Sequence, residues 1–99
     1  MLVTLERSSE ALPLLRKAAA LSANDVRTHR ELGKAYLHLN QLDDAEAELQ
    51  KTVQLAPESA PAHFILAQVY RKRGLSEKAR AELERYTALA ATHSSSDAQ

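Results

Sequence analysis

The sequence predicts an all-α fold, in which about five antiparallel helices stack on one another as a helical repeat array. The chain of 99 residues has only 2 Gly and 3 Pro, too few turn residues for an all-β domain. It also repeats itself with a period of 34 residues. When residues 26–59 are placed over residues 60–93, the number of identical positions is nine, against roughly two or three expected by chance. These pairs are His29/His63, Leu32/Leu66, Tyr36/Tyr70, Ala45/Ala79, Ala47/Ala81, Glu48/Glu82, Leu49/Leu83, Leu55/Leu89 and Ala56/Ala90. A period of this length is typical of small units that stack on their neighbours.

The repeat divides the chain into one domain and a tail. Residues 1–93 form a single helical repeat domain, with a leading half-repeat at 1–25 and full repeats at 26–59 and 60–93. Residues 94–99 are small and polar, and we expect a flexible tail there.

The half-repeat contains the first predicted helix, which ends at Leu21. Ser8 or Ser9 can cap its start, and Pro13 fits only if it lies in the first turn. Without the helix that would normally pair with it, this half-repeat is expected to leave apolar side chains uncovered. They are Leu12, Leu15 and Ala19.

The first full repeat is expected to hold two helices, at 26–39 and 42–55. Apolar residues and His29 recur at steps of three and four in the first helix, which Asn24 or Asp25 can cap. A turn follows at residues 40–41. The second helix begins with two aspartates, which complement the helix dipole, and Pro57 ends it.

The second full repeat follows the same plan. Ser59 is the expected cap of its first helix, and Pro61 lies in the first turn, where a missing N–H costs nothing. Gly74 is expected to end that helix in a left-handed conformation. Ser76 is the expected cap of the last helix, which should run to about Ala91.

These residues resemble the tetratricopeptide repeat (TPR) family. Leu32-Gly33 followed by Tyr36 matches the family's Leu-Gly-x-x-Tyr element, Ala45 matches its small contact residue, and Pro57 matches its closing proline. The second copy matches through Leu66-Ala67, Tyr70, Gly74 and Ala79. The chain departs from the family pattern at His29 and His63, where tryptophan is frequent, and at Tyr86, where a small residue is usual. The resemblance implies a right-handed superhelix whose first helices line a concave groove.

Composition and motifs argue against several classes of protein. Lys plus Arg and Asp plus Glu are 13 each, so no net charge favours nucleic acid or a membrane surface, and no stretch is long enough to insert into a membrane. Cysteine is absent, and so are the phosphate-loop, nucleophile-elbow and zinc-protease motifs. The histidines are expected to pack rather than bind metal. We therefore predict no enzyme, metal or cofactor, and, since no secretory signal is visible, a cytoplasmic location.

The charges of the two first helices suggest a binding surface. Opposite their packing faces lies a basic and partly apolar set of residues, whereas the 42–55 helix is mainly acidic. The predicted groove residues are Arg27, Arg30, Lys34, Leu37, His38, Phe64, Ile65, Gln68, Arg71 and Lys72. The prediction is a non-catalytic scaffold that belongs to a longer TPR protein and binds an acidic protein or peptide segment with apolar anchors. The alternative interpretation of this mixture of charges is a surface adapted for solubility.

Three points stay open at the level of sequence. Phe64 is either an anchor in the groove or a packing residue against the next helix. Tyr86 either ends the array or is covered by a partner. The alternative function is a homo-oligomerisation module that uses the exposed end faces of the array, while RNA binding is disfavoured because stacking aromatics are few.

Overall fold

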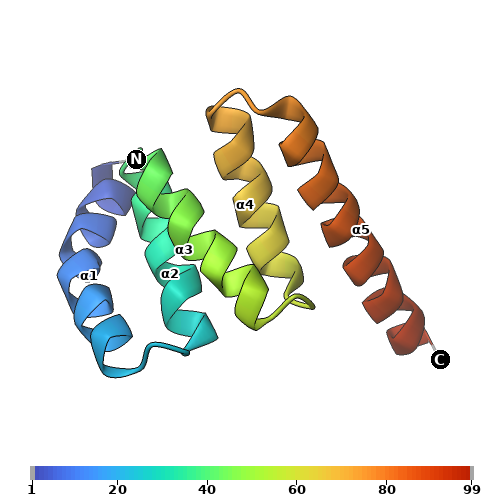
Figure 1. Ribbon diagram of the computed structural model, residues 1–99, viewed down its shortest axis with the longest axis horizontal. Helices are drawn as coiled ribbons and strands as arrows, with labels where there is room; N and C mark the ends of the chain where they lie inside the picture. Colours follow the sequence, from blue (N-terminus) through green and yellow to red (C-terminus); the bar gives the residue numbers. More distant parts are fainter. Residues whose placement is uncertain (1, 99) are drawn as a thin grey trace.

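The computed structural model describes residues 2–98, and the side chains of residues 9–91 (Figure 1). Over these residues the chain forms α-helices and no β-strand. The helices are α1 (Leu2–Leu21), α2 (Val26–His38), α3 (Leu42–Leu55), α4 (Ala60–Lys72) and α5 (Ser76–Ala98). The predicted all-α fold is therefore confirmed.

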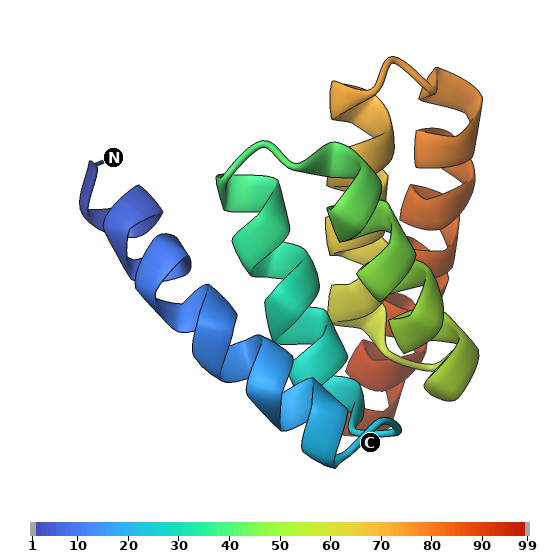
Figure 2. The same ribbon diagram turned by 60° about the vertical axis from the view of Figure 1, so that its left-hand side comes forward.

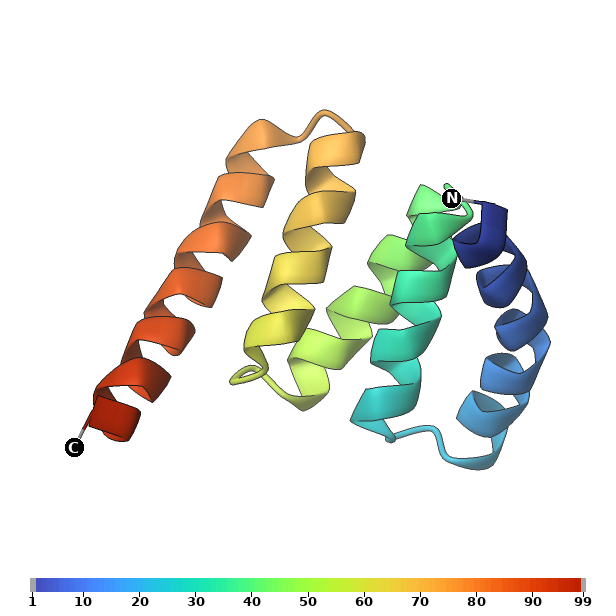
Figure 3. The same ribbon diagram turned by 180° about the vertical axis from the view of Figure 1, so that it is seen from behind.

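Each helix runs antiparallel to the one before it and packs against it, so the molecule is a sequential stack from α1 to α5 (Figure 1). The view turned by 60° places α1 at one end of the stack (Figure 2), and the view from behind shows α5 at the other end (Figure 3). Helices α2 and α4 also contact each other directly. The first helices of the two repeats are thereby neighbours, which is the arrangement that a shared groove requires.

Small residues let the paired helices approach closely. A Cβ atom built on Gly33 of α2 would lie 2.5 Å from Cγ of Leu49 in α3, too close for any side chain. Ala45 and Ala67 are completely buried, and Ala79 is 2% exposed. The sequence prediction that Ala45 and Ala79 lie at close contacts is confirmed.

Leu32, Leu49, Leu66 and Val69 form the centre of the hydrophobic core. The repeat register predicts that Leu83 is as buried as its equivalent Leu49, and this prediction is wrong, because Leu49 is completely buried and Leu83 is only half-buried. The helix of Leu49, α3, packs against α4 in addition to its pair helix α2, whereas within the described residues no helix follows α5 to cover Leu83.

The turns are equivalent in the two repeats. Asn40 and Gly74 are one period apart, and both adopt a left-handed conformation, with φ of 62° and 79°. Asp25 is the N-cap of α2 and accepts a hydrogen bond from the backbone N–H of Arg27 at 3.1 Å. Ser59 occupies the cap position of α4 without a side-chain bond to the helix. Ser76 is the first residue of α5 rather than its cap.

The first helix differs most from the prediction. It begins at Leu2, so Ser8 and Ser9 lie inside it, and Pro13 lies well beyond the first turn. Proline at this place removes the hydrogen bond to the carbonyl of Ser9, and its ring crowds that carbonyl; both residues are exposed, so water can bind the freed carbonyl oxygen. The predicted cap at Ser8 has its side chain outside the described residues.

The outward face of α1 also differs from the prediction. The side chains expected to be uncovered, Leu12, Leu15 and Ala19, are half-buried and pack against the core beside α2. The exposed leucines of α1 are instead Leu14 and Leu21, which are 71% and 81% exposed. At the other end of the chain, α5 continues to Ala98 and does not end at about Ala91. The side chains of residues 92–98 lie outside the description.

Candidate functional site

A hollow of about 390 Å³ lies where α2, α4 and α5 meet. Its lining includes the predicted apolar groove residues Leu37, Phe64 and Ile65, and also the positively charged Lys34. Its lining residues are Lys34, Leu37, His38, Pro61, Phe64, Ile65, Gln68 and Tyr86. The structure thus brings together side chains from both repeats, as the repeat register requires.

A second hollow, of about 430 Å³, is lined by Gln68, Arg71 and Lys72. Gln68 borders both hollows, so they adjoin along α4. Arg71 and Lys72 lie in the last turn of α4, where their positive charges also interact favourably with the negative end of the helix dipole. The apolar hollow therefore continues into a basic one.

Three predicted groove residues contribute less than expected. Arg27 and Arg30, at the start of α2, do not line either hollow; Arg27 is exposed and Arg30 is half-buried. Leu37 lines the first hollow but is only 6% exposed, so it forms its floor and can offer a partner little area. Lys34 pairs with Glu31 at 3.7 Å on the same helix.

Phe64 and Tyr86 form an aromatic pair at the edge of the first hollow. Their ring centroids are 5.1 Å apart and the rings are tilted by 46°. Phe64 is nevertheless 39% exposed, so it both packs against α5 and presents a face to the groove. Tyr86 stands one period after Thr52, which is completely buried. Pro61 and Tyr86 were not among the predicted groove residues. Pro61 lies on α4 on the same face as Phe64 and Gln68, whereas the place of Tyr86 depends on how α5 turns toward α4.

The acidic helix α3 is more involved in ion pairs than its sequence suggests. Arg73, the C-cap residue of α4, contacts Asp43, and its Nε lies 3.4 Å from Oε1 of Glu46. Glu46 also accepts a hydrogen bond from Gln50 at 2.9 Å. Glu46 therefore helps to hold the two repeats together.

Each repeat contains a buried histidine that bridges two segments. His29 Nδ1 lies 2.7 Å from Oε1 of Glu48 in α3, and its Nε2 donates to the carbonyl oxygen of Ala23. In the next repeat His63 makes the same contacts one period later, to Glu82 at 2.6 Å and to the carbonyl of Pro57 at 2.7 Å. These histidines are packing residues, as the sequence suggests.

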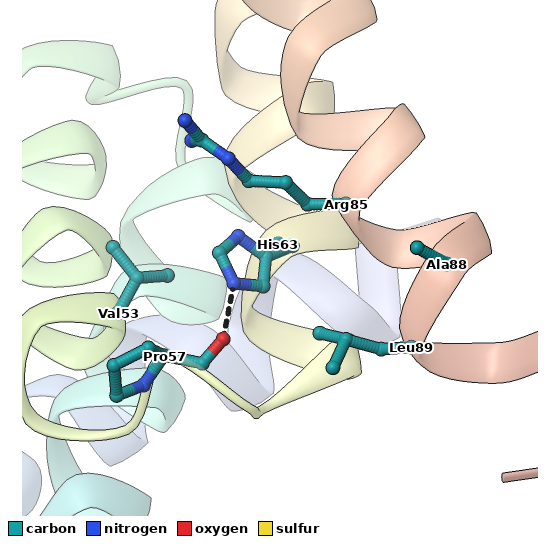
Figure 4. A pocket seen from close by; sticks show the side chains of 6 residues that line it. All are labelled: Val53, Pro57, His63, Arg85, Ala88 and Leu89. Carbon is teal, nitrogen blue, oxygen red and sulfur yellow. Dashed lines mark hydrogen bonds between the residues drawn. The ribbon is translucent and has the colours of Figure 1, made fainter. Parts of the chain in front are cut away.

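A third hollow, of about 440 Å³, lies between α3 and α5 with His63 at its base (Figure 4). Its lining is mainly apolar, and the dashed line in Figure 4 marks the bond from His63 to Pro57. Arg85 at its side is already bonded to Glu82 at 2.6 Å. The polar groups of this hollow therefore have partners within the chain.

Two general features bear on chemistry. Among the residues that the structure describes, no group of three or more His, Asp or Glu side chains could hold a metal ion. In the same part of the chain, no helix is long and apolar enough to cross a membrane.

The paired helices, their small contact residues and the 34-residue register define a helical repeat protein. Two sequence models of the tetratricopeptide repeat match the chain, over residues 2–54 and 31–94. The chain belongs to the tetratricopeptide repeat family, a family of protein–protein interaction scaffolds that are typically non-catalytic. No curated protein sequence matches it.

Solved structures of MamA have the same fold. The structure described as "MamA RS-1 ArsTM double mutant" is 26% identical, with a TM-score of 0.86 over 95% of this chain and 53% of that chain. MamA residues 41 to the end from Desulfovibrio magneticus RS-1 are 26% identical, with a TM-score of 0.83 over 92% of this chain and 51% of that one. The chain thus spans about half the length of these MamA structures.

Proposed function

We propose that this chain is a non-catalytic scaffold that binds an acidic protein segment along α2 and α4. The observation that carries the proposal is the continuity of the two hollows, one largely apolar and the other basic, which share Gln68. A segment that places an apolar side chain against Phe64 and Ile65 brings its following residues toward Arg71 and Lys72. A carboxylate there would meet two cations.

The two parts of this surface have different roles. Surface cations mainly steer a charged partner and set its register, so they act on the association rate. The exposed face of Phe64 and the half-buried Ile65 supply apolar area, which holds the complex once it has formed. Arg27 and Arg30 lie outside the hollows and would extend the positive field toward the start of α2.

The test begins with peptides selected against the chain from a displayed random library. We expect the selected peptides to combine one aromatic or branched apolar residue with acidic residues on one side of it. Binding kinetics are then measured with Arg71→Glu/Lys72→Glu, with Arg30→Glu/Lys34→Glu and with Phe64→Ala. Both charge reversals should slow association about tenfold and weaken its salt dependence, whereas Phe64→Ala should mainly speed dissociation.

Lys51→Glu is the matched control. Lys51 is an exposed lysine of α3 that lines none of the hollows, so reversing its charge changes the net charge without touching the groove. Glu46→Lys would not serve as a control, because it would break the pair between Glu46 and Arg73. If Lys51→Glu slowed association as much as the Arg71/Lys72 reversal, or if the selected peptides were basic, the groove assignment would be wrong.

A further inference from the structure

The outer face of α1 is an uncovered stripe with an unusual composition. Glu10, Leu14, Lys17 and Leu21 follow one another at steps of four, three and four, which places them within about 60° on the helix surface. All four are exposed, and the leucines are the two most exposed large apolar residues among the described side chains. The opposite side of α1, with Leu12, Leu15 and Ala19, packs toward α2.

The repeat register indicates what such a stripe contacts. Leu14 stands one period before Glu48 and two periods before Glu82. In each full repeat this glutamate lies on the second helix and contacts the histidine on the first helix, Glu48 contacting His29 and Glu82 contacting His63. Position 14 therefore faces the place of a paired helix. Within the described residues α1 contacts α2 alone, so this place is empty in the isolated chain. A leucine there cannot form the histidine contact, but it can pack against an apolar partner.

We propose that this stripe is a dimer interface, on which the α1 helix of a second copy packs in the antiparallel direction. The two-fold axis passes near Leu14, so that the Leu14 side chains of the two copies meet. Glu10 lies four residues before this point and Lys17 three residues after it. Antiparallel packing therefore places Glu10 of each copy beside Lys17 of the other.

The distribution of charge favours a second copy over a different partner. A two-fold interface needs a self-complementary surface, because residue i contacts residue j and j contacts i. One acid and one base on either side of an apolar centre meet this requirement. Parallel packing would place Glu10 against Glu10 and Lys17 against Lys17, which repel. The interface is small, since it consists of one helix pair, and we expect a dissociation constant between about 10 µM and 1 mM.

The test is sedimentation equilibrium of the 99-residue chain from about 10 µM to about 1 mM. The wild type should form a dimer that weakens at high salt. Leu14→Asn, which removes two leucines from each dimer, should weaken it about tenfold or more. Leu55→Asn is the matched control, because Leu55 is the repeat equivalent of Leu21, is 38% exposed and lies on α3. It should leave the dimer unchanged.

Charge reversal tests the orientation. Glu10→Lys and Lys17→Glu should each weaken the dimer several-fold, and the double variant should restore it. A mixture of the two single variants should form a heterodimer more readily than either forms a homodimer. All of these residues are exposed, so the variants should keep the helix content of the wild type, which circular dichroism checks.

Either of two results overturns the proposal. A chain that stays monomeric over the whole concentration range would mean that a preceding helix or a different protein covers the stripe. A dimer that is indifferent to Leu14→Asn and to the charge reversals would lie on another surface. Since the groove is formed by α2, α4 and α5, both results leave the peptide-binding proposal untouched.

Discussion

The buried histidines show how single residues tie the stack together. His29 and His63 each bind the carboxylate of the second helix and a backbone carbonyl of the loop before the first helix. A bulky apolar residue at this position could fill the space but could not bond both groups. The histidine and the glutamate are each identical in the two repeats because the same histidine–glutamate contact is formed in both.

We predict that His63→Ala destabilises the chain by about 2–4 kcal/mol, because it leaves the buried carboxylate of Glu82 and the backbone carbonyl of Pro57 short of a donor. His29→Ala should cost less, since the Glu48 side chain is 25% exposed and that of Glu82 only 8%. Urea unfolding of both variants measures the difference. Equal costs, or costs below about 1 kcal/mol at both sites, would show that the bonds contribute little beyond packing.

Asp25 gives a pH-dependent contribution at the start of α2. The hydrogen bond from the Thr28 hydroxyl, at 2.8 Å, is the main cause that lowers the pKa of Asp25 below its usual 3.8, and the backbone N–H of Arg27 adds to it. A lowered folded-state pKa means that the carboxylate stabilises the fold above the unfolded value, and that this stabilisation is lost as the pH falls through the folded value.

Asp25→Ala should therefore lower the unfolding midpoint at neutral pH, and the gap between variant and wild type should narrow as the pH falls below about 3.8. Thermal unfolding followed by circular dichroism at several pH values gives this comparison. A gap that stays constant from neutral pH to about pH 2.5 would mean that the charge of Asp25 contributes nothing to the cap.

At the scale of elements, the sequence predicts the helix pairs well and their ends less well. The pairing follows from the spacing of small and apolar residues, such as Gly33 of α2 opposite Leu49 of α3, and this spacing is visible in the chain itself. The start of α1 does not follow in the same way. Ser9 and Pro13 indicate a helix start when considered alone, but α1 continues past both, and the packing of Leu12, Leu15 and Ala19 against the core offsets the cost of the proline.

The close contact between α2 and α3 predicts the effect of added volume. Ala45 is completely buried beside the helix that holds Gly33, so Ala45→Leu should overpack this contact and destabilise the chain by about 1–3 kcal/mol. Ala47→Leu, an exposed position on the same helix, is the control and should change the unfolding free energy by less than about 0.5 kcal/mol. Similar effects of the two substitutions would place the helix contact elsewhere.

The groove illustrates what sequence cannot supply at this scale. The register predicted Phe64, Ile65 and Gln68 on the surface shared by the first helices, and all three line the hollow where α2, α4 and α5 meet. It could not show that Tyr86 of α5 reaches a hollow shared with α2, or that Glu46 pairs with Arg73, because the distance between α5 and α2 and that between Arg73 and α3 depend on how the two repeats are oriented. Contacts within a helix pair repeat with the sequence, whereas contacts between pairs depend on how the pairs turn relative to one another.

Across the whole molecule, stability should decrease toward the ends of the stack. In a repeat array each unit is held by its neighbours, and α1 is held by α2 alone, whereas α2 contacts α1, α3 and α4. Two exposed leucines on α1 add no packing in the monomer. The free energy needed to open α1 locally should therefore be lower than that needed to open α2 or α4.

Native-state hydrogen exchange tests this gradient and the dimer together. In dilute protein, the amides of α1 should exchange about tenfold or more faster than those of the core-facing turns of α4. As the concentration rises past the dissociation constant, α1 should become more protected, because the α1 helix of a second copy covers Leu14, while α4 should not change. The Leu14→Asn variant should lose this concentration dependence and keep the rest of the pattern. If α1 were as protected as α4 in dilute protein, the half-repeat would be stable through its contact with α2 alone, and the uncovered stripe would not weaken that end of the stack.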